Sequence, residues 1–200
     1  MPIYRIVIFF FVFSGVHFLQ ATLQIDIGST SGILINAENG KVLFEKNASK
    51  IMYPASCTKI AFALYAIKFH QDLFQKKLLC SSNALKAISE SQKSKNNFAN
   101  VPSHVLESDA SHMGLKVGEE LLFYDLLTAT MVVSGDDASN VLAEEMGGGS
   151  IEKCVTDVNH YLRSIGCKNT HFTNPHGLHH PNHVSTAEDL ALLCQEAMKE

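Results

Sequence analysis

Residues 32–35 and 41–44 are two short apolar runs, and the polar stretch between them ends in Asn39-Gly40. Asn-Gly between two strand-like runs is typical of a tight hairpin turn. The pattern therefore predicts an antiparallel β-hairpin over this part of the chain. A single hairpin is at best marginally stable, so its strands are expected to pair with others in a larger sheet.

Residues 60–67 are apolar at every position, so a helix over this run would have no polar face. A helix that is apolar all round is usually buried in a core. Pro54 and Ala55, just ahead of the run, suit a chain that is entering its first helical turn. The sequence predicts a buried helix over about residues 56–70.

Four later segments have a helical pattern: residues 124–133, 137–146, 150–165 and 186–200. Glycines follow the second and third of them, and Thr186 is a good N-cap for the fourth. Residues 81–111 are rich in Ser, Asn and Lys with little periodicity, so an exposed, loop-rich segment is expected there. The last helical pattern still runs at Glu200. Residues 22–200 are therefore expected to be the N-terminal portion of an incomplete domain, inactive alone.

Residues 1–21 differ from the rest of the chain. Arg5 is their only charged residue, residues 6–13 form an apolar core, and small Ala21 offers a cleavage position. This layout is typical of a secretory signal peptide, and the apolar run is short for a membrane span. An uncleaved N-terminal anchor is the alternative interpretation.

Composition limits the function classes. Hydrophobic residues make up 46% and charged residues 18% of the 200 residues, which indicates a globular protein. The formal net charge is −4 and no basic patch stands out, so no nucleic-acid partner is expected. The five cysteines include no C-x-x-C pair. Cys57 is expected to be a small buried residue. The sequence does not decide whether Cys154 and Cys167 form a disulfide.

Ser56 and Lys59 are three residues apart at the head of the predicted buried helix. This spacing places their side chains on the same face, with Ser56 at the positive end of the helix dipole. A serine hydroxyl needs a base to become a nucleophile, and a desolvated lysine that loses its charge is such a base. Ser56 is therefore the candidate nucleophile and Lys59 its candidate general base.

Ser134-Gly135-Asp136 lies at the break between two predicted helices. Ser134 offers a second hydroxyl on a short turn, and Asp136 offers a carboxylate that can compensate a buried lysine. By itself the segment also fits an ordinary helix–helix turn with an N-terminal acid. Together with Ser56 and Lys59 it indicates one catalytic cleft.

Four histidines, His176, His179, His180 and His183, are close together in the sequence. Their spacing matches no standard zinc signature, and Pro181 interrupts any helix there. No metal site and no cofactor are expected.

Residues 54–59, Pro-Ala-Ser-Cys-Thr-Lys, resemble the S-x-x-K motif of the serine D-alanyl-D-alanine carboxypeptidases, the low-molecular-mass penicillin-binding proteins. Residues 134–138, Ser-Gly-Asp-Asp-Ala, are similar to the S-G-N-D-A motif of that family. Residues 147–150, 174–178 and 183–190 resemble further family segments in the expected order. The resemblance covers the chain from about residue 32 to the last residue.

The resemblance implies an α/β fold of the β-lactamase/transpeptidase type. In this fold an antiparallel sheet is flanked by helices, and a helical lobe carries the middle motif. The hairpin would supply the first strands, and the C-terminal strands would lie beyond residue 200. The resemblance places the histidine tract, residues 176–183, in a structural loop.

The implied activity is removal of the terminal D-alanine from peptidoglycan stem peptides through an acyl-enzyme. Ser134 would relay a proton, Asp136 would contact the substrate, and β-lactams would inhibit by acylating Ser56. The implied location is the periplasm or the outer face of the cytoplasmic membrane, with peripheral attachment through later sequence left open.

Two features depart from the family. The middle motif of the family usually ends in Asn, and Asp136 stands there instead. An ionised Asp cannot donate a hydrogen bond to a carbonyl, and it favours the charged form of Lys59. The third motif, K-T-G, is absent from the 200 residues. A serine β-lactamase and a catalytically weak penicillin-binding regulatory module therefore remain alternatives.

Overall fold

The computed structural model describes residues 26–96 and 100–200. The predicted signal peptide, residues 1–21, lies outside the described residues. In the described part of the chain, no helix is long and apolar enough to cross a membrane.

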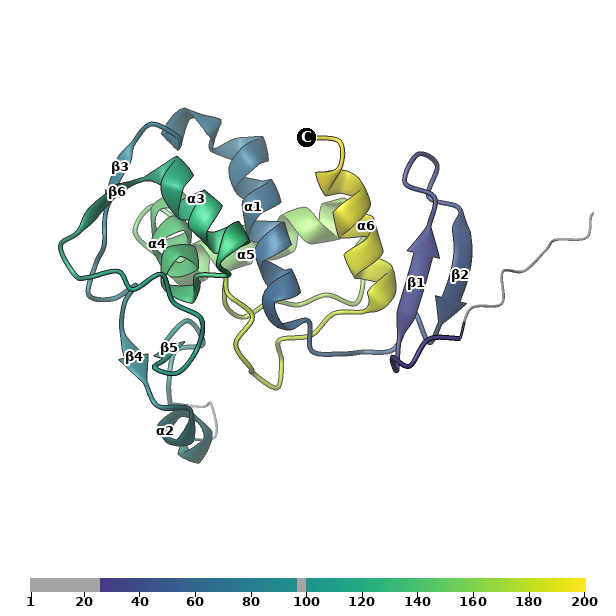
Figure 1. Cartoon of the computed structure of the whole chain (residues 1–200), viewed down its shortest axis with the longest axis horizontal. Helices are drawn as coiled ribbons and strands as arrows, with labels where there is room; N and C mark the ends of the chain where they lie inside the picture. Colours follow the sequence, from purple (N-terminus) through teal and green to yellow (C-terminus); the bar gives the residue numbers. More distant parts are fainter. Residues whose placement is uncertain (1–25, 97–99) are drawn as a thin grey trace, which may run out of the picture.

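The centre of the molecule is α1 (Thr58–Phe69), which packs against four other helices. These are α3 (Phe123–Val132), α4 (Asp136–Met146), α5 (Ile151–Ser164) and α6 (Ala187–Ala197). Phe62, Leu64 and Ala66 of α1 are buried in the core that these helices share. Figure 1 shows α1 between α3 on one side and α6 on the other. The predicted buried helix is confirmed.

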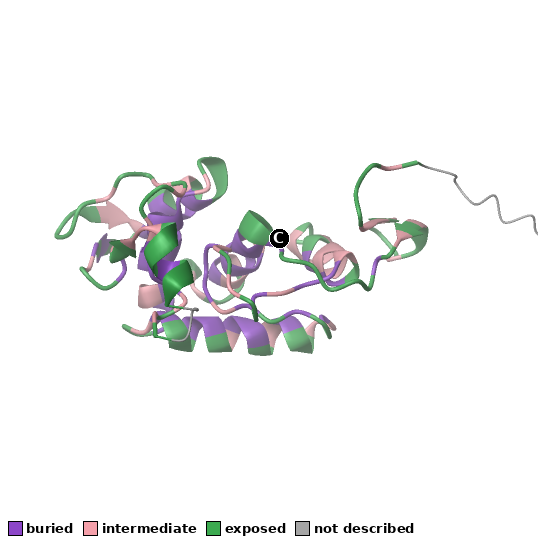
Figure 2. Cartoon of the chain, turned by 90° about the horizontal axis from the view of Figure 1, so that it is seen from below, coloured by how far each residue is buried: buried purple, intermediate pink, exposed green. Residues whose placement is uncertain are grey.

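Helix α5 is amphipathic and has a side-chain cap at its first turn. The buried positions of α5 (Ile151, Cys154, Val155, Val158 and Leu162) recur every three or four residues, as on one face of a helix. The Ser150 hydroxyl accepts the backbone N–H of Lys153 and so caps α5. Figure 2 shows buried residues in the interior of the helical body and exposed residues on the outer helix faces.

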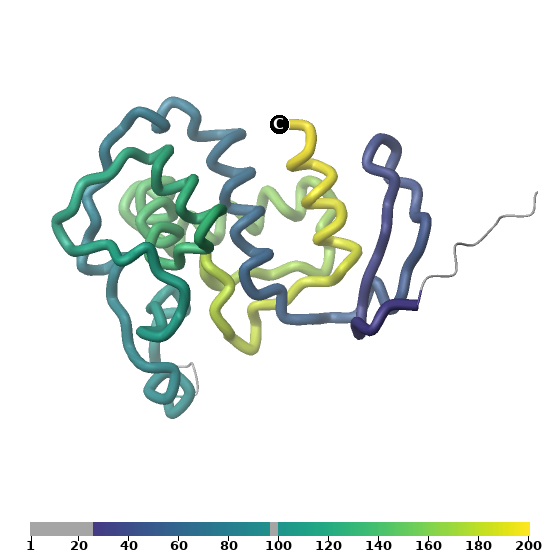
Figure 3. Tube along the Cα trace, in the orientation of Figure 1, coloured from purple at the N-terminus to yellow at the C-terminus, as the bar shows by residue number. Residues whose placement is uncertain are grey.

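The predicted hairpin is present as β1 (Gly32–Ile35) and β2 (Val42–Lys46), which pair antiparallel with a bulge after Leu34. It lies beside α6, so the first strands and the last helix are neighbours in space, as the trace in Figure 3 shows. The Gln195 side-chain amide donates a hydrogen bond of 2.8 Å to the Ala37 carbonyl across this contact.

Residues 81–111 are mostly turns and loops, and most of their described residues are exposed or partly exposed, as expected, but they also contain short regular elements that the sequence did not predict. They form the parallel strand pair β4 (Ala87–Ile88) and β5 (Leu106–Glu107), with α2 (Glu90–Lys95) between the strands. Lys93 of α2 is buried, and its Nζ lies 3.0 Å from the Val105 carbonyl and 3.2 Å from Glu107 Oε1. Strands of two residues are too short to produce a periodic pattern, so only the tertiary pairing reveals them.

Two more short strands, β3 (Lys77–Leu79) and β6 (Glu120–Leu122), pair antiparallel next to α3. Two 3-10 turns, Ala55–Cys57 and Gln71–Leu73, flank α1. The described residues thus combine a helical body with three two-stranded sheets, and the first 3-10 turn places Ser56 at the head of the central helix.

Candidate active site

Ser56 is the middle residue of the 3-10 turn that leads into α1, and it is exposed. The turn depends on an unusual backbone, because Ala55 has a positive φ of 48°. Gly177 packs against the outside of the same turn with a φ of +93°, and a Cβ there would lie 2.0 Å from the Ala55 carbonyl oxygen. Only glycine permits this approach, so the loop at residue 177 supports the turn that carries Ser56.

Lys59 lies one helical turn after Ser56 and is only 2% exposed. Its Nζ donates three hydrogen bonds: 3.1 Å to Ser56 Oγ, 2.6 Å to Asp136 Oδ1 and 2.7 Å to the His176 carbonyl oxygen. An ammonium group has three protons, so every proton of Lys59 has an acceptor. The pair with Asp136 is a buried salt bridge, and it compensates the charge of the lysine.

Ser134 and Asp136 reach the site from the short connection between α3 and α4. Ser134 has a positive φ of 58°, and its Oγ donates a 3.0 Å hydrogen bond to Ser56 Oγ. Asp136 is the first residue of α4 and is 4% exposed. Burial raises the pKa of the Asp136 carboxyl above its ordinary value, and the hydrogen bond and charge of Lys59 only partly offset this.

The four predicted site residues, Ser56, Lys59, Ser134 and Asp136, therefore meet in one cluster although 77 residues separate Lys59 from Asp136. The strained backbone of Ala55 and Ser134 flanks the two hydroxyl groups. Residues held in sparsely populated backbone regions cluster at functional sites, where the surrounding structure maintains the strain.

The sequence analysis missed the role of Asp137, the residue after the predicted cluster. Its two carboxylate oxygens accept the backbone N–H groups of Met113, Gly114 and Leu115 at 2.9, 2.9 and 3.0 Å. This ties the loop at residues 113–115 to the start of α4, next to Asp136. Its position directly after Asp136 in the middle motif was the one sequence signal that pointed to it.

His176 and His183 act as buried neutral hydrogen-bonding groups. His183 Nδ1 accepts the Thr173 backbone N–H, which leaves Nε2–H to donate to Thr58 Oγ1 at 2.7 Å. Burial lowers the pKa of His183 to about 3, and it lowers the pKa of His176 well below the ordinary value. These contacts join the loop after α5 to the head of α1. Among the described residues, no group of three or more His, Cys, Asp or Glu side chains could hold a metal ion.

The expectation that Cys57 is buried was wrong, because Cys57 is exposed. Thr58 and Lys59 turn inward at the start of α1, and the preceding 3-10 turn directs Cys57 outward. All five cysteines are free, so the structure contains no Cys154–Cys167 disulfide. Burial raises the pKa of both of these thiols to about 12.

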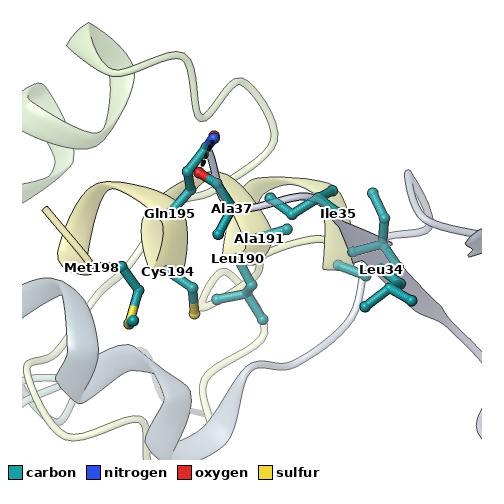
Figure 4. A pocket seen from close by; sticks show the side chains of 10 residues that line it. Leu34, Ile35, Ala37, Leu190, Ala191, Cys194, Gln195 and Met198 are labelled. Carbon is teal, nitrogen blue, oxygen red and sulfur yellow. Dashed lines mark hydrogen bonds between the residues drawn. The ribbon is translucent and has the colours of Figure 1, made fainter. Parts of the chain in front are cut away.

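An apolar pocket of about 420 Å³ lies between β1 and α6 and contains none of the four site residues. Figure 4 shows Leu34 and Ile35 of β1 on one side of it, and Leu190, Cys194 and Met198 on the other. Gln195, which bonds to the Ala37 carbonyl, bridges its rim. The pocket lining contains no carboxylate, histidine or lysine side chain, and burial raises the pKa of its one thiol, Cys194.

The sequence of the chain matches a known protein family. Residues 18–200 match the family model described as D-alanyl-D-alanine carboxypeptidase, peptidase S11. The chain belongs to this family. The match includes both motif segments and every helix of the described structure.

Individual members of the S11 family agree with this assignment. The chain is 31% identical to the D-alanyl-D-alanine carboxypeptidase DacF of Bacillus subtilis over 180 residues, which cover 90% of this chain and 41% of the relative. It is 32% identical to DacA of Escherichia coli K12 over 180 residues, which cover 87% of this chain and 40% of that relative.

Among solved structures, penicillin binding protein 5 of Haemophilus influenzae superposes with a TM-score of 0.73 and 28% identity over 88% of this chain and 46% of that one. Penicillin binding protein 6B of Escherichia coli superposes with a TM-score of 0.74 and 27% identity, and the superposition covers 90% of this chain and 53% of that one. The predicted fold type is confirmed. The chain spans about two fifths of the length of the curated S11 relatives that it matches.

Proposed function

We propose that the protein containing this chain is a serine D-alanyl-D-alanine carboxypeptidase of the bacterial cell wall. The observation that carries the proposal is that Lys59 Nζ and Ser134 Oγ lie 3.1 and 3.0 Å from Ser56 Oγ. A nucleophilic hydroxyl within hydrogen-bonding distance of an amine and a second hydroxyl is an arrangement that supports acyl transfer.

The proposed reaction begins with attack of Ser56 Oγ on the carbonyl carbon of the terminal peptide bond. Lys59 receives the hydroxyl proton, and the backbone N–H of Ser56 donates to the developing oxyanion. Ser134, hydrogen-bonded to Ser56 Oγ, passes a proton to the departing D-alanine amine. Water then hydrolyses the acyl-enzyme and restores Ser56.

In the same proposal Asp136 contacts the substrate as well as Lys59. An ionised carboxylate accepts hydrogen bonds and donates none, so Asp136 would bind an N–H group of the stem peptide rather than a carbonyl. We also propose export to the periplasm or to the outer face of the cytoplasmic membrane, where peptidoglycan lies. The N-terminal sequence layout supports this location.

A labelled penicillin tests the proposal, because a β-lactam carbonyl acylates the same nucleophile. In the intact protein the label is expected on a peptide containing Ser56, and Ser56→Ala is expected to abolish it. Cys57→Ala is the matched control: Cys57 is the exposed neighbouring nucleophile, and its removal is expected to leave labelling unchanged. Release of D-alanine from a synthetic stem peptide should follow the same pattern. Labelling that survives in Ser56→Ala contradicts the assignment.

A further inference from the structure

The hydrogen bonds around Lys59 raise a question about its role as a base. All three Nζ protons have acceptors, and the closest is Asp136 Oδ1 at 2.6 Å. A lysine in this arrangement is an ammonium ion, and an ammonium ion has no lone pair to take a proton from Ser56. Lys59 must therefore lose a proton before, or while, Ser56 attacks.

Ser56 Oγ accepts hydrogen bonds from both Lys59 and Ser134, at 3.1 and 3.0 Å. Neither donor is a base in this arrangement. The remaining acceptor on Lys59, the His176 carbonyl oxygen, is a very weak base. The Asp136 carboxylate is the only group bonded to Lys59, among the residues that the structure describes, that readily takes up a proton.

We propose that Asp136 is the proton acceptor for Ser56, with Lys59 as the relay between them. This inference rests on the proposed acylation of Ser56 and assigns to Asp136 a role beyond holding the charge of Lys59. Asp136 acts through Lys59, and the short 2.6 Å contact is the path of the proton.

The step balances without any further reactant. The bond between Nζ and one proton breaks, that proton bonds to Asp136 Oδ1, and Lys59 becomes a neutral amine. Rotation about the Cε–Nζ bond turns the lone pair toward Ser56, which then gives up its hydroxyl proton as Oγ bonds to the substrate carbonyl carbon. The result is a Lys59 ammonium, a neutral Asp136 carboxylic acid and a negatively charged oxyanion, so the net charge is unchanged.

The proton returns when the leaving group departs. Ser134 gives its proton to the leaving nitrogen, and Asp136 returns the stored proton through Lys59 to Ser134, since Lys59 Nζ and Ser134 Oγ lie on either side of Ser56 Oγ, 3.1 and 3.0 Å from it. The cluster therefore begins and ends each acylation with an ionised Asp136 and a charged Lys59.

The surroundings of Asp136 favour proton uptake by a carboxylate. Burial raises the pKa of Asp136, and the neighbouring Asp137 carboxylate raises it further, whereas Lys59 and His112 oppose the rise. The buried imidazole of His176 is neutral, because burial lowers its pKa well below the ordinary value. These are the titratable groups that face the Lys59–Asp136 pair from α1, from α4 and from the loops at residues 112 and 176.

The test is the pH profile of the acylation rate of the intact protein by a labelled penicillin. With Asp136 as acceptor, the wild-type rate is expected to stay within about twofold from pH 7 to pH 9 and to fall only as Asp136 protonates. Asp136→Asn removes the acceptor, so hydroxide must take the proton of Lys59, and the rate of this variant should rise about tenfold per pH unit from pH 7 to pH 9. Asp125→Asn removes an exposed carboxylate from the first turn of α3 and is the matched control.

Two results would overturn the role of Asp136. These are a wild-type rate that itself climbs tenfold per pH unit, and coincident profiles of wild type and Asp136→Asn. If instead the wild type is not acylated, or Ser56→Ala still is, the proposed function fails and not this step alone.

Discussion

Gly177→Ala should show whether the loop at residue 177 positions Ser56, apart from any effect on the stability of the fold. A Cβ at residue 177 would lie 2.0 Å from the Ala55 carbonyl oxygen, 2.4 Å from the Ala55 carbonyl carbon and 3.0 Å from the Ser56 nitrogen. Such atoms essentially never approach closer than 3.0 Å, so the turn and the loop must separate by about 1.0 Å. All three atoms belong to the backbone and cannot rotate away.

A displacement of this size moves Ser56 relative to Lys59 and Ser134. It also moves the neighbouring His176 carbonyl, to which Lys59 donates at 2.7 Å. Because a misplacement of about 1 Å costs on the order of a hundredfold in rate, we expect acylation by a labelled penicillin to slow about a hundredfold. The positive φ of 93° adds about 1–2 kcal/mol of backbone strain to the folded state.

Gly166→Ala is the matched control. Gly166 has a similar φ of +104°, but the nearest atom to its Cβ is Leu192 Cδ1 at 3.9 Å. Gly166→Ala should therefore lose stability in urea unfolding through the backbone strain alone and keep its acylation rate. Equal acylation rates for the two variants, once both are shown to be folded by circular dichroism, would refute the view that residue 177 supports the nucleophile turn.

Three further predictions concern stability. Asp137→Ala leaves the backbone N–H groups of residues 113–115 without acceptors and should lower the free energy of unfolding by about 3 kcal/mol or more, measured by urea denaturation. His183 has a pKa of about 3 when folded and an ordinary value of 6.5 when unfolded, so the unfolded state binds its proton first as the pH falls. The contribution of neutral His183 to the free energy of unfolding is complete above pH 6.5 and falls by about 1.4 kcal/mol per pH unit below it. The urea midpoint should therefore change less between pH 7 and pH 5 in His183→Asn than in the wild type. Thr186→Ala removes the hydroxyl that accepts the Asp189 N–H at the start of α6 and should lower the melting temperature, at a cost of about 1 kcal/mol.

Much of the helical structure was predictable because its signals are local. The apolar run of α1, the periodic positions of α5 and the Thr186 cap of α6 act over one or two helical turns, and the structure confirms each of them. The S-x-x-K spacing likewise places Ser56 and Lys59 one turn apart wherever that helix forms. The Asn-Gly turn was enough to predict the β1–β2 hairpin.

Other features depend on which segments meet, and no local pattern contains that information. The strands β4 and β5 exist because residues 87–88 pair with residues 106–107, which lie beyond α2 in the sequence. The exposure of Cys57 follows from the direction of a 3-10 turn. The sequence motifs implied that Asp136 lies near Lys59. They did not reveal that Lys59 donates all three protons, one of them to the backbone carbonyl of His176.

The difference has a physical cause. Helix periodicity and caps arise from interactions between residues three or four positions apart, so a short window of sequence determines them. The hydrogen bonds of Lys59 depend on acceptors 77 and 117 residues away, which only the packed chain brings within hydrogen-bonding distance. The sequence by itself determined which groups can react, and the tertiary structure decided which of them lie within hydrogen-bonding distance of one another.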